Sequence, residues 1–345
     1  MKKQRYTIKD VAKQAGVAVS TASIALSNKG YISIGLRKKV LQAAERLKYI
    51  PNRSARSLIN KATGNIGFIV SEEHFSTAEP FYTKVFLGTE FEARQHDYYI
   101  LLTTVPNQFR SSHLPRFILE QNVDGLILAG KISEAYATAL TSEGLPAVVI
   151  DFDFKKVHLP TVNIDNSRGI DLAIEHLFGL GHRQIAFVGG DLSHPSIRAR
   201  LESYNMAQEK LGLTPENCHV SVEEPNTGAE DGYRATMKLL DNHVTFTAVV
   251  ACNDAVAIGS MRALRDRGLK VPDAVSVIGF DDVELCDHVE PKLTSIRVPK
   301  EELGAAALRI LTRAIKEGNH HISTVLVQPT LVLRDSTNVV SQLKD

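Results

Sequence analysis

Two short apolar repeats separated by a glycine occupy residues 7–28, TIKDVAKQAGVAVSTASIALSN, and restrict how this chain can fold. The first repeat has apolar residues at helical spacing: Ile8, Val11, Ala12 and Ala15. Gly16 then allows a tight turn, and a second short helix is predicted over 19–27 with a polar outer face. Two such helices form a helix-turn-helix whose second helix can enter the DNA major groove. An α-hairpin from a small helical bundle has the same pattern.

Charge is divided unevenly along the chain. Residues 1–61 contain 14 Lys and Arg but only two acidic residues, Asp10 and Glu45, so this segment carries +12. The rest of the chain carries −11, and the whole chain +1. A cationic head suits a polyanion, either nucleic acid or an anionic membrane surface. The head lacks the large apolar face that binding to a membrane surface requires, so charge favours nucleic acid.

Targeting signals and cysteines indicate where such a chain works. No apolar run approaches the roughly 18 residues of a membrane-spanning helix, and the first residues, MKKQRY, lack the apolar core of a secretory signal. Three scattered cysteines, Cys218, Cys252 and Cys286, have no metal-ligand spacing. We therefore expect a reduced cytoplasmic chain with no metal site and no cofactor.

A third helix is predicted from an N-cap at Ser33 to Leu47, and its apolar stripe closes a three-helix head. Pro51 ends this unit. Asn52 then caps a short segment, RSARSL at 53–58, which has too little apolar surface to fold alone. It is either a solvated linker or a helix that forms only against DNA. We therefore predict a DNA-binding domain at 1–50 and a hinge helix or linker at 51–61.

Five stretches of the head, TIKDVA at 7–12, AGV at 15–17, ST at 20–21, YIPN at 49–52 and ARSL at 55–58, resemble the LacI (lactose-repressor) family of bacterial transcription regulators. The resemblance implies that residues 52–60 form a hinge helix in the minor groove, where Leu58 wedges into a base step. It implies the following DNA-binding residues: Thr7, Val19, Ser20, Thr21, Ser23, Ile24, Asn28, Tyr31, Asn52, Arg53, Ala55, Arg56 and Leu58. Lysines and arginines of the head would bind phosphates, so affinity should fall steeply with salt.

Two residues of the head depart from the family pattern. Ile24 stands where an Arg is common, and isoleucine cannot pair with guanine, although it can contact a thymine methyl. Ala18 stands where a Ser N-cap is common, which weakens the second helix by about 1 kcal/mol. The operator sequence is therefore not transferable from better-known relatives.

The body, from residue 62, alternates short apolar runs with helical stretches. Strands are predicted at 65–70, 98–105, 123–130, 146–152, 184–190, 246–252 and 275–280. These are too many for one ordinary sheet, and a break near 159–165 with returning segments near 293–298 and 325–333 indicates two lobes. We expect an all-α helix-turn-helix head plus an α/β body, a two-lobed periplasmic-binding-protein-like fold of parallel sheets. The lobes are predicted at about 62–161 with 293–325, and about 162–292 with 326–340.

The resemblance continues through the body, in VNIDN at 162–166, LGHRQIA at 180–186, Asn253-Asp254 and VSVIGFDD at 275–282. It implies an effector site between the lobes, with these residues: Phe75, Phe81, Tyr82, Asp151, Ser196, Arg200, Asn226, Asn253 and Asp281. Amide and carboxylate oxygens read hydroxyl groups, and arginine adds a rigid fork of donors, which suits a carbohydrate. Purines and phosphorylated effectors remain alternatives, and a phosphoprotein co-regulator is undetermined.

Several of these residues have structural alternatives. Arg200 is also consistent with a structural ion pair, and Asp281 or Asp282 with a helix cap. Phe81 and Tyr82 suit a core as well as a pocket. We interpret His182 as a structural residue and the pair at 320–321 as a surface pair, because no further ligand lies at metal spacing.

Other classes of protein fit less well. The chain has no GxxxxGK[ST], GxSxG or HExxH motif, which argues against the enzymes that use them. A periplasmic sugar-binding protein has no use for a +12 head. We therefore predict a repressor, not an enzyme, that binds a near-palindromic operator at the nucleoid as a homodimer under control of a small molecule. Only twelve residues follow Leu333 and they contain no heptads, so no tetramerisation coil is expected.

Overall fold

The computed structural model describes residues 6–27, 31–49, 62–72, 81–106, 110, 114–213, 218–318 and 322–340. The chain divides into two units, Met1–Gly64 and Asn65–Asp345, which we call the head and the body. The sequence placed the start of the body at residue 62. The predicted 51–61 segment lies outside the described residues.

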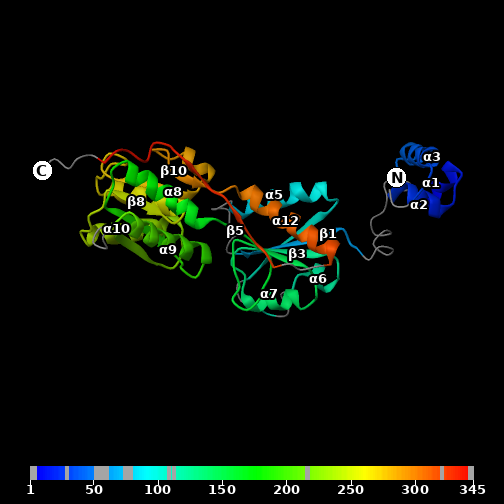
Figure 1. The fold of residues 1–345 in the computed structure, drawn as a ribbon, viewed down its shortest axis with the longest axis horizontal. Coiled ribbons are helices and arrows are strands. Elements are labelled where there is room, and N and C mark those ends of the chain that lie inside the picture. Colours follow the sequence, from blue (N-terminus) through cyan, green and yellow to red (C-terminus); the bar gives the residue numbers. More distant parts are fainter. Residues whose placement is uncertain are drawn as a thin grey trace. The chain divides into compact units, whose positions relative to one another are not determined.

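The head is a three-helix unit, as predicted, with helices α1 (Ile8–Ala15), α2 (Val19–Ser27) and α3 (Ile34–Arg46) (Figure 1). Gly16 ends α1 with a φ of 66°, in the left-handed region where glycine carries no steric cost. Ser33 caps α3 by accepting a hydrogen bond from Leu36 N. Each helix contributes buried apolar residues to one small core: Val11, Ala12, Ala22, Ala25, Val40, Ala43 and Ala44.

Within the described residues, the body contains two six-stranded sheets, the first parallel throughout and the second parallel except for the β10–β12 pair. The first sheet has the order β11-β5-β4-β3-β1-β2, and the second the order β12-β10-β9-β8-β6-β7. The first-sheet strands are β1 (Asn65–Ser71), β2 (Tyr99–Val105), β3 (Gly125–Ala129), β4 (Ala147–Ile150), β5 (Thr161–Ile164) and β11 (Thr324–Val327). The second-sheet strands are β6 (Ile185–Gly190), β7 (Cys218–Glu224), β8 (Ala248–Ala251), β9 (Ser276–Asp281), β10 (Thr294–Arg297) and β12 (Thr330–Val332).

Helices cover both faces of each sheet, which explains why the central strands are apolar on both sides. On the first sheet, α5 (Phe81–Gln95) and α12 (Lys300–Glu317) lie on one face, and α6 (Arg116–Leu119) and α7 (Glu134–Thr141) on the other (Figure 1). In the second lobe, α8 (Asn166–Gly179) packs on α9 (Pro195–Lys210), and α10 (Ala229–Asp241) packs on α11 (Asp254–Asp266). A short 3-10 helix, η4, spans Glu284–Asp287. None of the helices in the described ranges is long and apolar enough to cross a bilayer.

Sheet membership corrects the predicted division of the lobes. Strand β10 pairs with β9 in the second sheet, although the sequence assigned residues 293–325 as a whole to the first lobe. Strand β5 pairs with β4 in the first sheet, although the second lobe was predicted to begin at 162. In both places the chain completes a hydrogen-bonded strand before it crosses to the other sheet. The three crossings therefore follow β5, β10 and β11.

Candidate functional site

Helix α2 exposes the face that was predicted to contact DNA. Ala22 and Ala25 are buried in the head, whereas Val19 and Ile24 are 43% and 38% exposed. Ser20 is exposed on the same helix, and Thr21 and Ser23 are half-buried. Tyr31, which precedes α3, is fully exposed. The apolar side chains at Val19 and Ile24 are unusual for a solvent-facing helix surface and suit contact with thymine methyl groups.

The start of α1 is fixed by a local cap. The Thr7 backbone N–H and hydroxyl both donate to Asp10 Oδ2, at 2.7 and 2.8 Å. These hydrogen bonds hold the pKa of Asp10 below its usual value. Thr7 thus has a structural role at the exposed end of α1, in addition to its predicted DNA contact. Six other predicted DNA-binding residues lie outside the described residues: Asn28, Asn52, Arg53, Ala55, Arg56 and Leu58.

The carboxyl ends of the two sheets contact each other through a polar cluster centred on Asp151. Asp151 follows β4 in the first lobe and is 5% exposed. Tyr82 of α5 donates its hydroxyl to Asp151 Oδ2 at 2.9 Å, and Ser196 of α9 donates to Asp151 Oδ1 at 2.5 Å. Burial and the Asp151 charge raise the pKa of the Tyr82 hydroxyl well above its usual value, so it remains a neutral donor. One carboxylate therefore joins the two lobes through hydroxyl groups.

Arg200 holds the other half of this cluster in the second lobe, and its side chain is 3% exposed. Its Nε donates to Asn166 Oδ1 at 2.8 Å and its Nη1 to the carbonyl of Cys252 at 2.6 Å. The Nη2 atom lies 3.3 Å from Asp281 Oδ1, at the end of β9. The guanidinium carbon also lies 3.6 Å above the centroid of the Phe280 ring. The ion pair considered from the sequence is therefore present within the predicted site.

Burial and charge compete at Asp281. Burial raises the pKa of this carboxyl, while the positive charges of Arg200 and Lys300 oppose that rise. Asp281 and its neighbour Asp282 have φ values of 105° and 54°, in the left-handed region that favours glycine. Asp282 forms ion pairs with Arg297 and Arg334, so neither aspartate acts as the helix cap that the sequence also allowed. We call the six residues where the lobes meet, Tyr82, Asp151, Asn166, Ser196, Arg200 and Asp281, the interlobe network. The bond from Ser196 to Asp151 crosses between the lobes, and Asn166, Arg200 and Asp281 lie on the second-lobe side.

Other predicted effector residues lie near this network with different roles. Asn253 caps α11, because its Oδ1 accepts from Val256 N, and its Nδ2 donates to the carbonyl of Thr227. Asn226 is exposed beside Gly190, at the carboxyl end of β6. Phe81 is 9% exposed and packs edge-to-face on Tyr82, so it belongs to the core as well as to the site. Phe75 lies outside the described residues.

The sequence reasoning missed several residues beside the network. His194 caps α9, and its Nε2 lies 3.9 Å from Asp151 Oδ2. Burial lowers the pKa of His194, and its Nδ1 accepts from Ser196 N, which identifies a neutral imidazole. Lys131 follows β3 and reaches Asp191, which follows β6, at 3.0 Å. Lys131 and Asp191 could have been found, because each follows a parallel strand of its own sheet, and ligand sites form outside the carboxyl ends of such strands.

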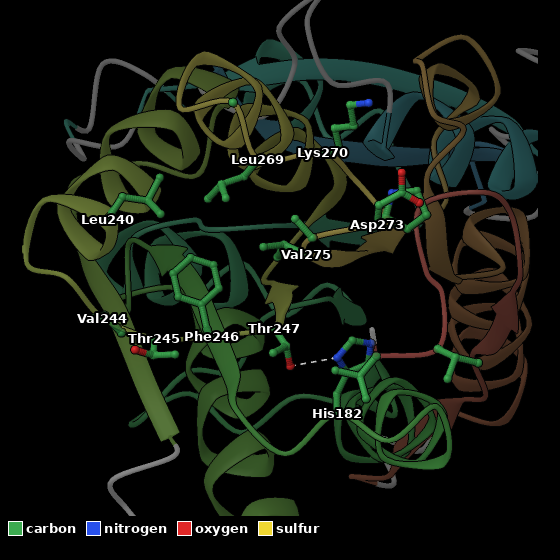
Figure 2. Close-up of a pocket in the computed structure, with 15 residues that line it drawn as sticks. His182, Leu240, Val244, Thr245, Phe246, Thr247, Leu269, Lys270, Asp273 and Val275 are labelled. Atoms are coloured by element: carbon green, nitrogen blue, oxygen red, sulfur yellow. Dashed lines mark hydrogen bonds between the residues drawn. The ribbon is translucent and has the colours of Figure 1, made fainter. Parts of the chain in front are cut away.

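Two of the hollows that border the second lobe lie at opposite edges of its sheet. A hollow of about 260 Å³ borders the interlobe network and is lined from both lobes, by Phe152, Asn163, Asn166, Ser196 and Met206 among others. A larger one, of about 650 Å³, lies at the opposite, amino-terminal edge of the second sheet (Figure 2). There His182 Nδ1 lies 2.9 Å from Thr247 Oγ1, and its Nε2 lies 3.0 Å from Ser276 Oγ. His182 thus ties strand starts together far from the network.

Among the described residues, no three His, Cys, Asp or Glu side chains are grouped so that they could hold a metal ion. The histidine pair at 320–321 includes residues outside the described ranges.

Comparison with known proteins places both units. Residues 7–52 match the family model described as bacterial regulatory proteins, lacI family, and residues 174–337 match a periplasmic binding protein-like domain. The chain is 32% identical over 333 residues to the ribose operon repressor of Haemophilus influenzae, covering 96% of this chain and 98% of that one. It is 29% identical to a lac repressor dimer crystallised with operator and the anti-inducer ONPF, with a TM-score of 0.78 over 97% of this chain and all of that one. A LacI family regulator from Enterococcus faecium with bound ribose is 26% identical, with a TM-score of 0.70 over 80% of this chain and all of that one.

Proposed function

This chain belongs to the LacI family of bacterial regulatory proteins, and we propose that it is a repressor that releases or binds its operator in response to a sugar held between the lobes. It is a DNA-binding transcriptional regulator and not an enzyme. The head supplies the DNA-binding surface, and the body supplies the effector site. We place its action in the bacterial cytoplasm, at the nucleoid.

The observation that carries the effector site is the interlobe network. It brings Asp151 of the first lobe and Arg200 and Asp281 of the second lobe to facing strand edges. Each lobe contributes acceptors and donors, so a ligand that binds both lobes changes the free energy of their arrangement. The adjoining hollow of about 260 Å³ is lined from both lobes.

The chemistry of the network favours a neutral, hydroxyl-rich effector. Asp151 already accepts two hydroxyl groups, from Tyr82 and Ser196, which effector hydroxyls can replace without uncovering a charge. Two cations at this edge are matched by carboxylates, Arg200 by Asp281 and Lys131 by Asp191, and a third, Lys300, is held by backbone carbonyls. A phosphate or a carboxylate would have to break one of these pairs, whereas a sugar would not. Ribose in the Enterococcus faecium regulator supports a sugar here.

The surface of the first lobe offers a place for a second subunit. Leu87 and Phe91 of α5 are 40% and 53% exposed, and Tyr99 of the edge strand β2 is 61% exposed. An exposed edge strand beside an apolar helix face is the kind of surface that pairing with a copy of the chain removes from water. We infer that dimers form through this face and present two heads to a near-palindromic operator. The lac repressor, a dimer bound to operator, supports a dimer that binds DNA.

Coupling between the two sites follows from the segment that joins them. We infer that the 51–61 segments of two subunits meet and fold on DNA in one arrangement of the lobes, as the hinge helices expected from the sequence. An effector that favours another arrangement separates the segments and lowers operator affinity, and a co-repressor acts in the opposite direction.

The experiment that tests the effector site is a thermal-shift screen of the full chain against sugars, sugar phosphates, nucleosides and purine bases. A ligand at 100 times its Kd stabilises the native state by about 2.7 kcal/mol, which is readily detected. Arg200→Ala should lose the response, and Asp151→Asn, a milder change, should weaken it at least tenfold. Arg198→Ala is the matched control, because Arg198 lies on the same helix, is exposed, and its side chain donates, among the described residues, only to the carbonyl of Leu192.

Each outcome of the screen has a distinct meaning. A sugar response that disappears in Arg200→Ala and persists in Arg198→Ala supports the effector site. A response to sugar phosphates or purines alone contradicts the neutral-sugar assignment. A response that survives both Arg200→Ala and Asp151→Asn places the ligand elsewhere in the body.

A further inference from the structure

A lysine other than Lys131 also crosses between the lobes, and it has no assigned role in effector binding. Lys300 is the first residue of α12, and its side chain is 3% exposed. Its ammonium donates to the backbone carbonyl of Asp281 and, at 3.3 Å, to that of Asp282. Helix α12 covers the first sheet, whereas both carbonyls belong to the end of β9 in the second sheet. Lys300 therefore connects the first lobe to the strand end that carries Asp281.

The helix that carries Lys300 is rigidly attached to α5. A Cβ atom added at Gly88 of α5 would lie 1.9 Å from the Glu301 carbonyl oxygen, and one added at Gly304 would lie 2.0 Å from the Val85 carbonyl oxygen. The two helices thus touch backbone to backbone, and only glycine permits this approach. Tyr82 of α5 and Lys300 of α12 consequently form one unit. The Lys300 ammonium also lies 5.8 Å from the ring centroid of Phe81.

Lys300 binds a segment of backbone whose conformation is strained. Asp281 and Asp282 both have positive φ values, a conformation that costs non-glycine residues of order 1–3 kcal/mol each and persists where the surroundings impose it. Other contacts hold Asp282, since its N–H donates to Ser295 Oγ at 3.1 Å and its carboxylate pairs with Arg297. The Asp281 carbonyl accepts from Val298 N at 3.4 Å and also from Lys300 in a charge-assisted bond, while the Asp281 carboxylate contacts Arg200.

We propose that Lys300 is a positioning residue that fixes the orientation of Asp281 and fastens the binding edge of the second lobe to the α5–α12 pair of the first. The effect of Lys300 on effector affinity rests on the proposed function, whereas its effect on the backbone at Asp281 does not. The Lys300 ammonium links the first lobe to the end of β9 in the second lobe. A change in the arrangement of the lobes therefore alters the effector site, and an effector bound there alters the arrangement of the lobes.

The first test needs no ligand and uses hydrogen–deuterium exchange of the full chain. In Lys300→Met, a side chain of similar length without charge, amides in residues 279–285 should exchange at least about tenfold faster, since a bond from a charged donor to this backbone is lost. Lys300→Arg should restore most of the protection. The matched control is Lys84→Met, because Lys84 of α5 lines the same hollow as Lys300 and, among the described residues, forms no ion pair with the end of β9.

The pattern of exchange decides whether the role is local. The inference requires faster exchange at 279–285 while amides of β3 and the second half of α12 keep their protection. Unchanged exchange at 279–285 in Lys300→Met overturns it. Faster exchange throughout the body in both Met and Arg variants also overturns it, because a general packing defect is not a positioning role.

The second test links the residue to the effector and separates two failures. With a sugar identified in the thermal-shift screen, Lys300→Met should weaken binding at least about tenfold and Lys300→Arg less. Weaker binding with unchanged exchange would make Lys300 a direct ligand contact and overturn the positioning role. If the exchange result holds and no compound in the screen binds the wild-type chain, the sugar assignment fails while the role of Lys300 on the backbone stands.

Discussion

The two lobes share one plan but hold their binding aspartates differently. Strands β4 and β9 occupy the same position in the two sheet orders, and Asp151 and Asp281 stand at their carboxyl ends. Both aspartates have positive φ values, 56° and 105°. The Asp151 carboxylate receives two neutral hydroxyls, whereas Asp281 faces the cations of Arg200 and Lys300. The aspartates at these equivalent positions therefore differ in their partners: Asp151 has neutral hydroxyls that a ligand can replace, and Asp281 has cations.

The crossover helices extend this comparison. Helix α8 follows β5 into the second lobe and begins with Asn166, and α12 follows β10 into the first lobe and begins with Lys300. Both first residues are buried, and each reaches the network, Asn166 by accepting from Arg200 and Lys300 by donating to Asp281. From this difference we infer that effector hydroxyls replace the hydroxyl partners of Asp151 in the first lobe. The charged contacts of Asp281 in the second lobe stay in place.

The largest expected effect comes from breaking the charged edge. Arg200→Ala leaves the Asp281 carboxylate, which is 15% exposed, without its ion-pair partner, and should lower the free energy of unfolding of the body by about 3 kcal/mol. Urea denaturation followed by far-UV circular dichroism measures this loss. Arg198→Ala should stay within about 0.5 kcal/mol of wild type. A similarly small loss of stability in Arg200→Ala would contradict the proposal that Asp281 is held by charge and Asp151 is not.

A pH-dependent effect follows for Asp254, which starts α11 in the second lobe. Burial, with the charge of Asp281, raises the pKa of Asp254 from 3.8 to about 7. The native state thus holds a proton that the unfolded state releases between about pH 4 and 7, so the unfolding free energy falls as pH rises through this window, by at most about 1.4 kcal/mol per pH unit. Asp254→Asn should lack this contribution. Denaturation of both proteins from pH 5 to 8 measures the difference.

Three histidines change stability with pH in the opposite direction to Asp254. Wild type must therefore be compared with Asp254→Asn. Burial lowers the pKa values of His176, His182 and His194, so their contribution to stability is lost as pH falls below the ordinary histidine value of 6.5. The difference between wild type and Asp254→Asn cancels these shared contributions. A difference that stays constant with pH would show that Asp254 does not titrate in this window.

The head and the central strands could be predicted from sequence because local patterns determine them. Apolar spacing and Gly16 located α1 and α2, and Ser33 located the start of α3. Double-sided apolar runs located strands such as β1 and β8. Strand β7 was missed, because it is an edge strand whose sequence, CHVSVEE, alternates polar and apolar residues. Strand β5 was read as a break for the related reason that it is short and partly polar.

Residues of the site could be predicted only where they stand at the end of a strand or in a motif that resembles the LacI family. Asp151 and Asp281 follow that rule, and the structure brings both into the interlobe network. Lys300 gives no such signal, since it begins a helix on one lobe and binds backbone carbonyls of the other. Its partners depend on where the chain crosses between sheets, which strand pairing decides. Asn253 shows the converse, because a strand-end position also suits a helix cap.

A smaller effect is expected from the hydroxyl partner of Asp151. Tyr82→Phe removes one hydroxyl from a buried carboxylate and should lower the free energy of unfolding by about 1.5–3 kcal/mol, less than Arg200→Ala. Tyr98→Phe, at a half-buried tyrosine of the same lobe, is the matched control and should change stability by less than about 0.5 kcal/mol. Chemical denaturation at pH 7 compares them. A loss in Tyr82→Phe equal to that in Arg200→Ala would mean that both aspartates are held with equal strength.

The smallest effect concerns a polar residue that the second lobe does not use in its network. Gln208 on α9 is 2% exposed, and neither amide atom has a hydrogen-bond partner among the described residues. Burial of an unpaired amide costs about 1–3 kcal/mol, whereas methionine fills nearly the same volume without that cost. Gln208→Met should therefore raise the free energy of unfolding by about 1 kcal/mol and leave effector binding unchanged, as urea denaturation and the thermal-shift assay can measure. A loss of stability would indicate that Gln208 bonds an ordered water, and that α9 contains a second buried polar contact beyond the interlobe network.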